Sequence, residues 1–506
     1  MARGMFLLHD TLSGKRRPPA SGDGRPVSVY LCGVTVYDDA HVGHARTVIV
    51  FDVLRRYLQR RGVRVRMVQN FTDVDDKIIA RARAEGVTAD VIGNRYIGRY
   101  RAEFERLNVL RADLYPRATE HIGDIVSFVA DLIRKGSAYV SENGVYFAVS
   151  SFGRYGMLSK KRVDELKSGA RIEVDAAKRD PLDFALWKFD DGDPSWDSPW
   201  GRGRPGWHIE CSAMSIKHLG ERLDIHGGGR DLIFPHHENE IAQSESRTGG
   251  EFARIWMHVG MVTIQGEKMS KSLGNIRSVG RALADWGPNV IRLFCLSGHY
   301  SKPVDYSEGN LQESLVRWRQ LEACLCELGC AVRSGAGLAA AATTAAATTA
   351  AATTTAAATT EADAEALQGA ARRGLAMIRE RFDAALDDDL NTHLAISALM
   401  EIVSETNGLV AADGIGGRPG AGWAAAAMSE MSYMMDVLGL SPAASDESES
   451  MEIDARIAER AALRDEGRYG EADAIRDSLG GRGIELIDRV GGTVWVKREP
   501  IGRDGR

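Results

Sequence analysis

The segment LCGVTVYDDAHVGHARTVIVFDVLRRYL places one cysteine and two histidines between a strand-like stretch and an amphipathic run. His41 and His44 flank Gly43 at what would be a strand-to-helix turn. Backbone N–H groups at a helix N-terminus attract phosphate, and a glycine there lets a ligand approach the backbone. This HVGH turn therefore indicates a phosphate site. Cys32 has no second cysteine nearby with which to form a local CxxC metal site.

A second group of candidate residues lies far along the chain, in GEKMSKSLGN. Lys268 and Lys271 stand between Gly266 and Gly274, which predicts a loop that carries two ammonium groups. Cations that surround a departing pyrophosphate stabilise the charge that develops on it. Either motif alone could be an ordinary exposed turn. Together, in this order, they favour a site that handles a pyrophosphate leaving group.

Three predicted elements must position the HVGH turn. VSVYLCG reads as a buried strand, VGHARTVIVFDVLRRYLQRR as a helix that ends at Gly62, and VRVRMVQNFT as a second strand. A strand, a helix and a strand in this order form a βαβ unit, the opening of a doubly wound parallel sheet. We therefore predict an α/β fold of the Rossmann type.

The pattern changes after Pro116 and returns later. A helix (IGDIVSFVADLIRKG) and a hairpin (AYVSENGVYFAV) precede a segment rich in Trp, Pro and Gly, and strand-like character resumes at LDIHGG and IWMHVGMV. This order predicts an insertion that splits the sheet, followed from Ser307 by helices. The predicted divisions are a first sheet half at 1–115, an insertion at 116–205, a second sheet half at 206–265, the lysine loop and its surroundings at 266–310, a helical bundle at 311–445 and a small C-terminal domain at 446–506.

Two segments of the helical region carry no predicted chemistry. Residues 334–361 are low-complexity Ala/Thr sequence, for which we expect a surface insertion that needs no fold of its own. Asp387, Asp388 and Asp389 resemble a metal-binding run, but we interpret them as a solvated corner between helices, with Asn391 or Thr392 as the next N-cap.

Composition narrows the functional classes. The net charge of −6 gives no overall basic field, so a nucleic-acid partner would meet local patches. Six irregularly spaced cysteines argue against a disulfide framework and favour a reducing compartment. The sequence shows neither a signal h-region nor an apolar run of membrane-spanning length. We expect a cytoplasmic protein with no membrane association.

Longer strings make the likeness to a known family specific. LCGVTVYDDAHVGHART, NFTDVDDKII, RPGWHIECSAM, DIHGGGRDLIFPHHENEIAQSE and MVTIQGEKMSKSLGN resemble the cysteinyl-tRNA synthetase family, within the class I aminoacyl-tRNA synthetases. The resemblance covers most of residues 25 to 310, and more loosely the helical and C-terminal parts. Val34 and His393 depart from the family's usual residues, and the Ala/Thr tract is a larger departure.

The resemblance implies a zinc site that explains the isolated cysteine. The family's ligands map onto Cys32, Cys211, His236 and Glu240. His236 and Glu240 stand four residues apart after Pro235, a spacing that would place both on one face of a helix. Two thiolates, an imidazole and a carboxylate form a donor set that suits zinc. Without the resemblance to the family, we would interpret the two cysteines as small, buried apolar residues.

The resemblance also implies substrates and their contacts. Cysteine would react with ATP, accompanied by Mg²⁺, and the cysteinyl group would pass to tRNA(Cys), with the protein acting as a monomer. Thr72 and Trp207 would line the amino-acid pocket, and no separate editing domain is expected. The implied ATP contacts and catalytic residues are His41, Gly43, His44, Gly229, Asp231, Lys268 and Lys271. The implied anticodon contacts are Arg464, Tyr469, Asp473 and Asp488.

Three alternatives remain open at this point. A ligase of the same ancestry that joins cysteine to an amino-sugar would share the catalytic half but end before an anticodon module. A non-catalytic tRNA-binding paralogue would have lost a histidine or lysine of the two motifs, and both motifs are intact. A nicotinamide-dependent enzyme on the same sheet would need GxGxxG where this chain has CGVTVYD.

Overall fold

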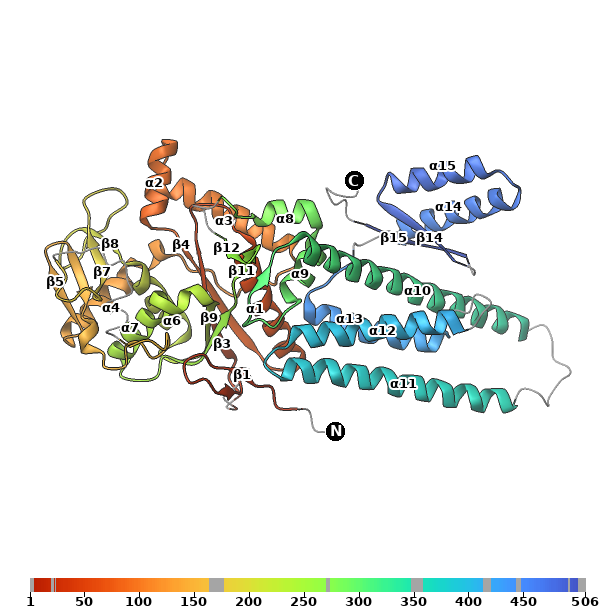
Figure 1. The fold of residues 1–506 in the computed structure, drawn as a ribbon, viewed down its shortest axis with the longest axis horizontal. Coiled ribbons are helices and arrows are strands. Elements are labelled where there is room, and N and C mark those ends of the chain that lie inside the picture. The colour runs from red at the N-terminus through yellow and green to blue at the C-terminus, as the bar shows by residue number, and fades with distance from the viewer. Residues whose placement is uncertain are drawn as a thin grey trace. The chain divides into compact units, whose positions relative to one another are not determined.

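The computed structural model describes residues 4–19, 22, 24–162, 177–269, 274–346, 358–412, 420–442, 447–489 and 492–498 (Figure 1). The chain divides into two compact units. The first contains Met1–Ala282, Gly298–Tyr306 and Asp387–Asn391, and the second contains Leu283–Ser297, Ser307–Leu386 and Thr392–Arg506. Among the described residues, no helix combines the length and apolar character needed to span a membrane.

A four-stranded parallel sheet with the order β10-β9-β3-β4 organises the first unit. Its strands are β3 (Val27–Thr35), β4 (Val65–Thr72), β9 (Leu223–Gly229) and β10 (Ala253–Val259). From β3 the chain goes to β4 on one side, and the later strands β9 and β10 lie on the other. Ligands bind at the carboxyl ends of the strands where the order reverses in this way. The predicted Rossmann-type sheet is confirmed.

Helix α1 (Val42–Arg60) connects β3 to β4 and packs closely on the sheet. A Cβ added to Gly227 of β9 would lie only 2.0 Å from Cζ of Phe51, so the strand must carry glycine there. Arg46 is fully buried, and its guanidinium donates to the backbone carbonyls of Gly260 and His299 at 2.8 and 3.3 Å. Burial of an arginine is favourable only when its N–H groups are hydrogen-bonded. These carbonyls therefore fix the position of α1 against the segments that contain Gly260 and His299.

The segment between β4 and β9 adds helices and a second sheet. Helices α2 (Asp76–Glu85) and α3 (Ala89–Arg106) come first, and α4 (Ile122–Arg134) follows. The antiparallel sheet has the order β5-β6-β7-β8 and its own apolar core around Phe128, Phe147 and Trp187. Its strands are Ala138–Ser141, Gly144–Phe147, Phe184–Phe189 and Gly203–Pro205. The predicted helix and hairpin of the insertion are confirmed, and the exact domain boundaries stay a prediction.

Shorter elements complete the first unit. They are β1 (Leu8–His9), β2 (Arg16–Arg17), η1 (Ala118–His121), η2 (Val149–Ser151), α6 (Trp207–Leu219), η3 (Arg230–Leu232), η4 (Ile233–His237), α7 (Glu238–Thr248), β11 (Val262–Ile264), β12 (Glu267–Lys268) and β13 (Val304–Asp305). Strand β11 pairs with both β12 and β13.

The second unit is mainly helical. Its long helices are α9 (Pro288–Leu296), α10 (Glu308–Ala346), α11 (Ala358–Asp387), α12 (Thr392–Ala412) and α13 (Ala421–Leu438), and α8 (Val279–Trp286) runs into it from the first unit. The C-terminal part contains α14 (Glu447–Asp465), α15 (Tyr469–Gly480) and the hairpin β14 (Ile484–Arg489) with β15 (Gly492–Lys497). A small core around Ile453, Ile475 and Leu486 joins these four elements.

Regular structure extends into the Ala/Thr tract, contrary to our expectation. Helix α10 continues to Ala346 and α11 begins at Ala358, so helix enters residues 334–361 from both ends. Alanine has the highest helix propensity, and a helix that has already formed extends at little cost. Residues 347–357 of the tract lie outside the described part of the chain.

The expectation of a solvated corner between helices holds for Asp388, which is exposed, and is wrong for Asp387 and Asp389. The Asp389 side chain is buried and accepts hydrogen bonds from the backbone N–H of His9 at 2.7 Å and from the Tyr300 hydroxyl at 2.8 Å. Asp387 accepts from Tyr57 at 2.8 Å and forms an ion pair with Arg61. These partners are far away in the sequence, so local charge density alone could not reveal them.

The contact between β9 and α1 leads to a stability prediction. Gly227→Ala should destabilise the first unit by roughly 1–3 kcal/mol, because its Cβ would overlap Phe51. Gly98→Ala is the matched control, since Gly98 is exposed in α3 and nothing lies within 4 Å of an added Cβ. That change should stabilise the helix by about 0.5–1 kcal/mol. Differential scanning calorimetry should show opposite shifts in Tm, and equal shifts would contradict the tight packing.

Candidate active site and metal centre

The two histidines of the HVGH turn cap α1 reciprocally. Nδ1 of His41 accepts from the backbone N–H of His44 at 3.3 Å, and Nδ1 of His44 accepts from the backbone N–H of His41 at 3.2 Å. The two rings stack with centroids 3.6 Å apart. An acceptor nitrogen carries no proton, so in the neutral ring the proton must stand on Nε2. Each histidine can therefore present an Nε2–H donor to a phosphate oxygen.

Burial keeps His44 neutral. Desolvation, followed by the neighbouring His41, holds the pKa of His44 well below its usual value. Gly43 also serves this arrangement, because a Cβ there would lie 2.9 Å from Cε1 of His41. The sequence suggested that glycine admits a ligand to the backbone. In the structure its first effect is to leave room for the His41 ring.

The segment that follows the lysine loop meets the HVGH turn through the backbone. The N–H of Val42 donates to the carbonyl of Arg277 at 3.0 Å, and the N–H of Val279 donates to that of Ala40 at 2.8 Å. Met269 Cε also lies 3.5 Å from the place that a Cβ of Gly43 would take. The two motifs are thus neighbours, as their joint chemistry requires.

The two lysines of the loop differ in what the structure describes. Lys268 lies in β12, is exposed and pairs in register with Thr263 of β11. Lys271 falls within residues 270–273, which lie outside the described part of the chain. Its position therefore stays a prediction.

Four residues predicted as metal ligands come together from distant elements. Cys32 lies on β3, Cys211 on α6, His236 in the turn before α7 and Glu240 on α7. One ligand atom of each lies within 4.8 Å of the others, and all four residues are buried. Nε2 of His236 is 3.1 Å from Oε1 of Glu240. The helix begins at Glu238 rather than directly after Pro235, yet the spacing of four still brings both side chains to one face.

The chemistry of this cluster fits a cation. Burial, then Cys211 and Glu240, raises the pKa of the Cys32 thiol well above its usual value. Burial lowers the pKa of His236 to about 3, so its ring is the neutral form that binds metals. Among the described residues, Oε2 of Glu240 is buried and makes no hydrogen bond, although Nε2 of His226 lies 3.3 Å from it. A divalent cation would satisfy two thiols and a carboxylate that are enclosed in this way.

A second donor set overlaps the first and was missed at the sequence level. It combines Cys32 and Glu240 with His226 of β9 and His237. Nδ1 of His237 contacts Nε2 of His258 at 2.8 Å, while Nε2 of His237 is buried without a hydrogen bond. The histidines in DIHGGG and FPHH were visible in the sequence, but only the folded sheet brings them to the same point.

The residues predicted for the amino-acid pocket lie beside this cluster. The Trp207 ring stacks on His236, with centroids 4.3 Å apart, and is 39% exposed. Thr72 is buried at the end of β4, where its hydroxyl accepts from the Asn70 side-chain amide at 3.5 Å. A small substrate held against Trp207 would therefore be within reach of a cation in the cluster.

Gly229 and Asp231 lie together at the carboxyl end of β9. A Cβ on Gly229 would stand 2.5 Å from Oδ1 of Asp231, so only glycine leaves this carboxylate in place. The Gly229 carbonyl and the Asp231 carboxylate, at the end of a parallel strand, are acceptors that suit ribose hydroxyls.

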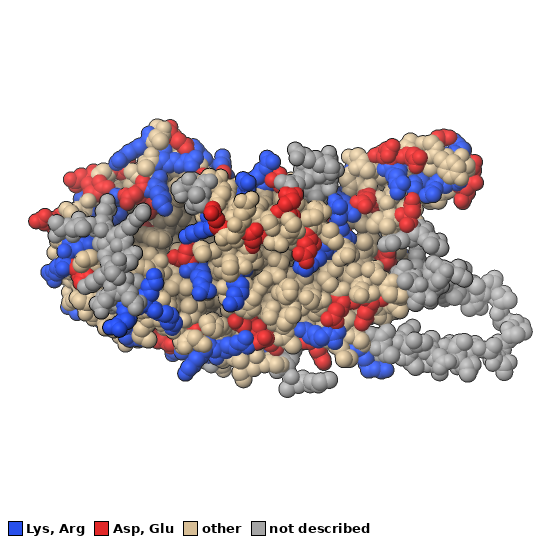
Figure 2. All heavy atoms as spheres, in the orientation of Figure 1, with Lys and Arg blue, Asp and Glu red and all other residues tan. Residues whose placement is uncertain are grey.

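The four residues predicted for the anticodon lie in α14, α15 and β14. Asp488 accepts from Arg460, with N–O distances of 2.7 and 2.9 Å, and from Arg464 at 3.2 Å. Hydrogen bonds from Arg460 and Thr493, with the nearby charge of Arg476, lower the pKa of Asp488. Tyr469 at the start of α15 is 63% exposed, and Asp473 is also exposed. Figure 2 shows blue and red side chains intermixed over α14 and α15, with no single-sign patch on that face.

The lowered pKa of His44 leads to a spectroscopic prediction. Because its folded pKa lies below that of the unfolded chain, protonation opposes folding, and the free energy of unfolding should fall as pH drops below about 6.5. Nitrogen-15 NMR of histidine-labelled protein should show a neutral His44 ring with bare Nδ1 down to pH 5.5. His44→Asn would assign the signal. Titration of that signal near its ordinary pKa would contradict the reciprocal cap.

Comparisons with known proteins agree with this geometry. Residues 20–316 match the family model for the tRNA synthetases class I (C) catalytic domain, and residues 381–441 match the DALR domain. The chain is 44% identical to the cysteine–tRNA ligase of Stutzerimonas stutzeri, over 97% of this chain and 99% of that protein. It is 43% identical to the cysteine–tRNA ligase of Desulforudis audaxviator, with the same coverage.

Solved structures show the same fold at lower identity. Methionyl-tRNA synthetase of Mycobacterium tuberculosis, in complex with methionyl-adenylate, has a TM-score of 0.58 and 18% sequence identity, covering 82% of this chain and 89% of that one. A putative arginyl-tRNA synthetase of Campylobacter jejuni has a TM-score of 0.54 and 12% identity, covering 83% and 94%. The chain belongs to the class I aminoacyl-tRNA synthetases, and within them to the cysteine–tRNA ligase family.

Proposed function

We propose that this protein activates L-cysteine with ATP and transfers the cysteinyl group to the 3′ end of tRNA(Cys). The observation that carries the proposal is the pairing of the HVGH turn with the segment after the lysine loop, next to a buried Cys/Cys/His/Glu cluster. The carboxyl ends of the sheet strands thus bring together hydrogen-bond donors for phosphate and soft ligand atoms for a metal. The full-length relatives named cysteine–tRNA ligase support the same reaction.

In the first step the cysteine carboxylate attacks the α-phosphate of ATP, and pyrophosphate leaves. His41 and His44 donate from Nε2 to the phosphate oxygens, and the N-terminus of α1 attracts the same charge. Lys268 and Lys271 stabilise the departing pyrophosphate, and Mg²⁺ accompanies ATP. Gly229 and Asp231 hold the ribose. In the second step the terminal ribose hydroxyl of tRNA attacks the acyl carbonyl, and AMP leaves.

We assign zinc to the set Cys32, Cys211, His236 and Glu240 rather than to the overlapping set with His226 and His237. The chosen set contains two thiols, which zinc prefers. His208 also supports it, because its Nδ1 lies 3.0 Å from Nδ1 of His236 and orients the ring so that Nε2 faces the cluster. A bound zinc ion would supply a soft acceptor that favours the thiolate of cysteine over the hydroxyl of serine.

Trp207 and Thr72 complete the selection of the amino acid. The stacked pair of Trp207 and His236 forms one wall, and Thr72 lies on the β4 side. An apolar pocket alone separates close analogues by only ~1–3 kcal/mol. A direct contact to sulfur therefore removes the need for a separate editing domain.

The C-terminal domain would read the anticodon. Tyr469 offers an exposed ring on which an unpaired base can stack, and Asp473 offers an acceptor beside it. Arg464 forms an ion pair with Asp488, so these two side chains would contact the tRNA together.

We further propose that the protein acts in the cytoplasm as a monomer. An amino-sugar ligase is disfavoured, because the chain covers 99% of the tRNA ligase relatives, C-terminal part included.

Pyrophosphate exchange tests the proposed reaction. Purified protein should incorporate labelled pyrophosphate into ATP with cysteine and without tRNA, since every residue assigned to activation precedes residue 280. Lys271→Ala should slow the exchange about 10²-fold with little change in cysteine affinity, because its contact strengthens in the transition state. Lys302→Ala, an exposed lysine outside the loop, is the matched control. Exchange with a different amino acid, or none at all, would refute the proposal.

Metal analysis tests the zinc assignment. The protein should contain about one zinc per chain, and Cys211→Ser should lower both this content and cysteine activation, because a hard hydroxyl replaces a soft thiolate. Cys324→Ser, at a buried cysteine outside the cluster, should leave zinc unchanged. With Co²⁺ in place of zinc, cysteine but not serine should intensify the sulfur-to-metal absorption. Identical spectra with both amino acids would make the metal purely structural.

A further inference from the structure

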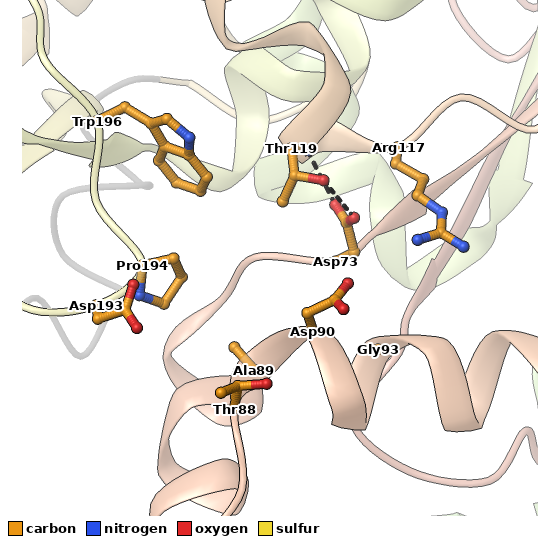
Figure 3. Close-up of a pocket in the computed structure, with 10 residues that line it drawn as sticks. All are labelled: Asp73, Thr88, Ala89, Asp90, Gly93, Arg117, Thr119, Asp193, Pro194 and Trp196. Atoms are coloured by element: carbon orange, nitrogen blue, oxygen red, sulfur yellow. Dashed lines mark hydrogen bonds between the residues drawn. The ribbon is translucent and has the colours of Figure 1, made fainter.

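A cavity of about 250 Å³ in the first unit is lined by none of the residues that we assign to activation. We call it the Trp196 pocket. It lies between the start of α3, the turn that begins η1 and the segment before β8. Figure 3 shows Trp196 and Pro194 on one side, and Asp73, Thr119 and Arg117 across from them.

The floor of the pocket is rigid and adjoins the proposed cysteine site. Asp73 follows directly after Thr72 at the end of β4 and is only 8% exposed. Its carboxylate accepts from the backbone N–H of Thr119 at 3.0 Å and from the Thr119 hydroxyl at 2.6 Å. A carboxylate has about four acceptor positions, so further N–H donors can still bind it.

The opposite wall presents a fixed aromatic ring. Reciprocal backbone hydrogen bonds with Gly203, at 2.7 and 2.9 Å, hold Trp196 in place. One part of the ring packs against the apolar cores of the insertion and of the sheet, and the rest lines the cavity. A half-buried tryptophan opposite polar groups is typical of a surface on which an unpaired base stacks.

The charge of the pocket selects among ligands. Asp73, Asp90 and Asp193 contribute three carboxylates, against one guanidinium from Arg117. That guanidinium already donates to Oδ1 of Asn94 at 2.8 Å. An acidic lining repels phosphate and accepts N–H groups. It therefore suits a base with an exocyclic amino group, adenine or cytosine, whose own phosphates stay outside.

We propose that the Trp196 pocket receives an amino-bearing base from the unpaired 3′ end of tRNA and so positions the terminal ribose for acyl transfer. This inference rests on the proposed function. The unpaired 3′ end of tRNA has the sequence CCA, in which every base carries an exocyclic amine. Transfer requires the terminal hydroxyl within a few ångströms of the activated carbonyl, and the pocket begins one residue beyond Thr72.

The test separates activation from transfer in the full-length protein. Trp196→Leu should leave tRNA-independent pyrophosphate exchange within twofold of wild type. It should slow single-turnover transfer from preformed cysteinyl-adenylate to tRNA by roughly tenfold or more, the loss expected for one stacking contact. Trp196→Phe should restore most of the rate. Trp200→Leu is the matched control, because this half-buried tryptophan packs on the insertion core and does not line the pocket.

A second arm changes the tRNA and needs no altered protein. Each of the three terminal bases is replaced in turn by uracil, which has a carbonyl in place of the amine. One replacement should slow transfer by wild-type protein. The same replacement should reduce the transfer rate of Trp196→Leu by a smaller factor, since the contact is already lost. Equal costs in both proteins, or equal losses in exchange and transfer, would overturn the pocket assignment. Absence of exchange in wild type would instead refute the proposed function.

Discussion

Strand β3 is the element on which both candidate centres depend. It lies inside the parallel sheet, between β4 and β9, and carries Cys32 in its second half, before the chain reaches His41 and α1. A central strand can move only if its neighbours on both sides move with it. Strand β3 pairs with β4 on both sides of an irregularity between Leu31 and Val34, and Cys32 lies within that irregularity. The paired residues on either side therefore hold Cys32 in place on the same strand that leads to α1.

Electrostatics then decides which groups are charged near that strand. Burial removes charge from the histidines, so His44 and His236 are neutral and can act as a donor and as a ligand, respectively. The same burial encloses two thiols and the Glu240 carboxylate, for which the described part of the chain supplies histidines and no lysine or arginine ion pair. Lys268, in the described part of the lysine loop, contributes an exposed ammonium group. This division suits a reaction in which negative charge arrives with ATP and departs with pyrophosphate.

Local sequence patterns predicted the elements better than their ends. The alternation in VSVYLCG and the helical spacing after His41 identified β3 and α1, and the family resemblance named the four ligands before their proximity could be known. The patterns failed where long-range partners decide the outcome. Asp387 and Asp389 looked solvated because their partners Arg61 and Tyr300 are far away in the chain. The Ala/Thr tract looked unstructured because helix propensity was weighed without the helices that extend into it.

The sequence by itself determined the order of elements, the two phosphate-handling motifs and, through resemblance, the reaction class, because these depend on residue types at short spacing. Only the tertiary structure showed that Nδ1 of both histidines is consumed by the cap of α1, that His226 and His237 border the same cluster, and that Trp196 faces Asp73 across a cavity. Each of these facts joins side chains whose separation is set by sheet register and by burial. A linear pattern contains neither, because register and burial exist only once the strands have paired.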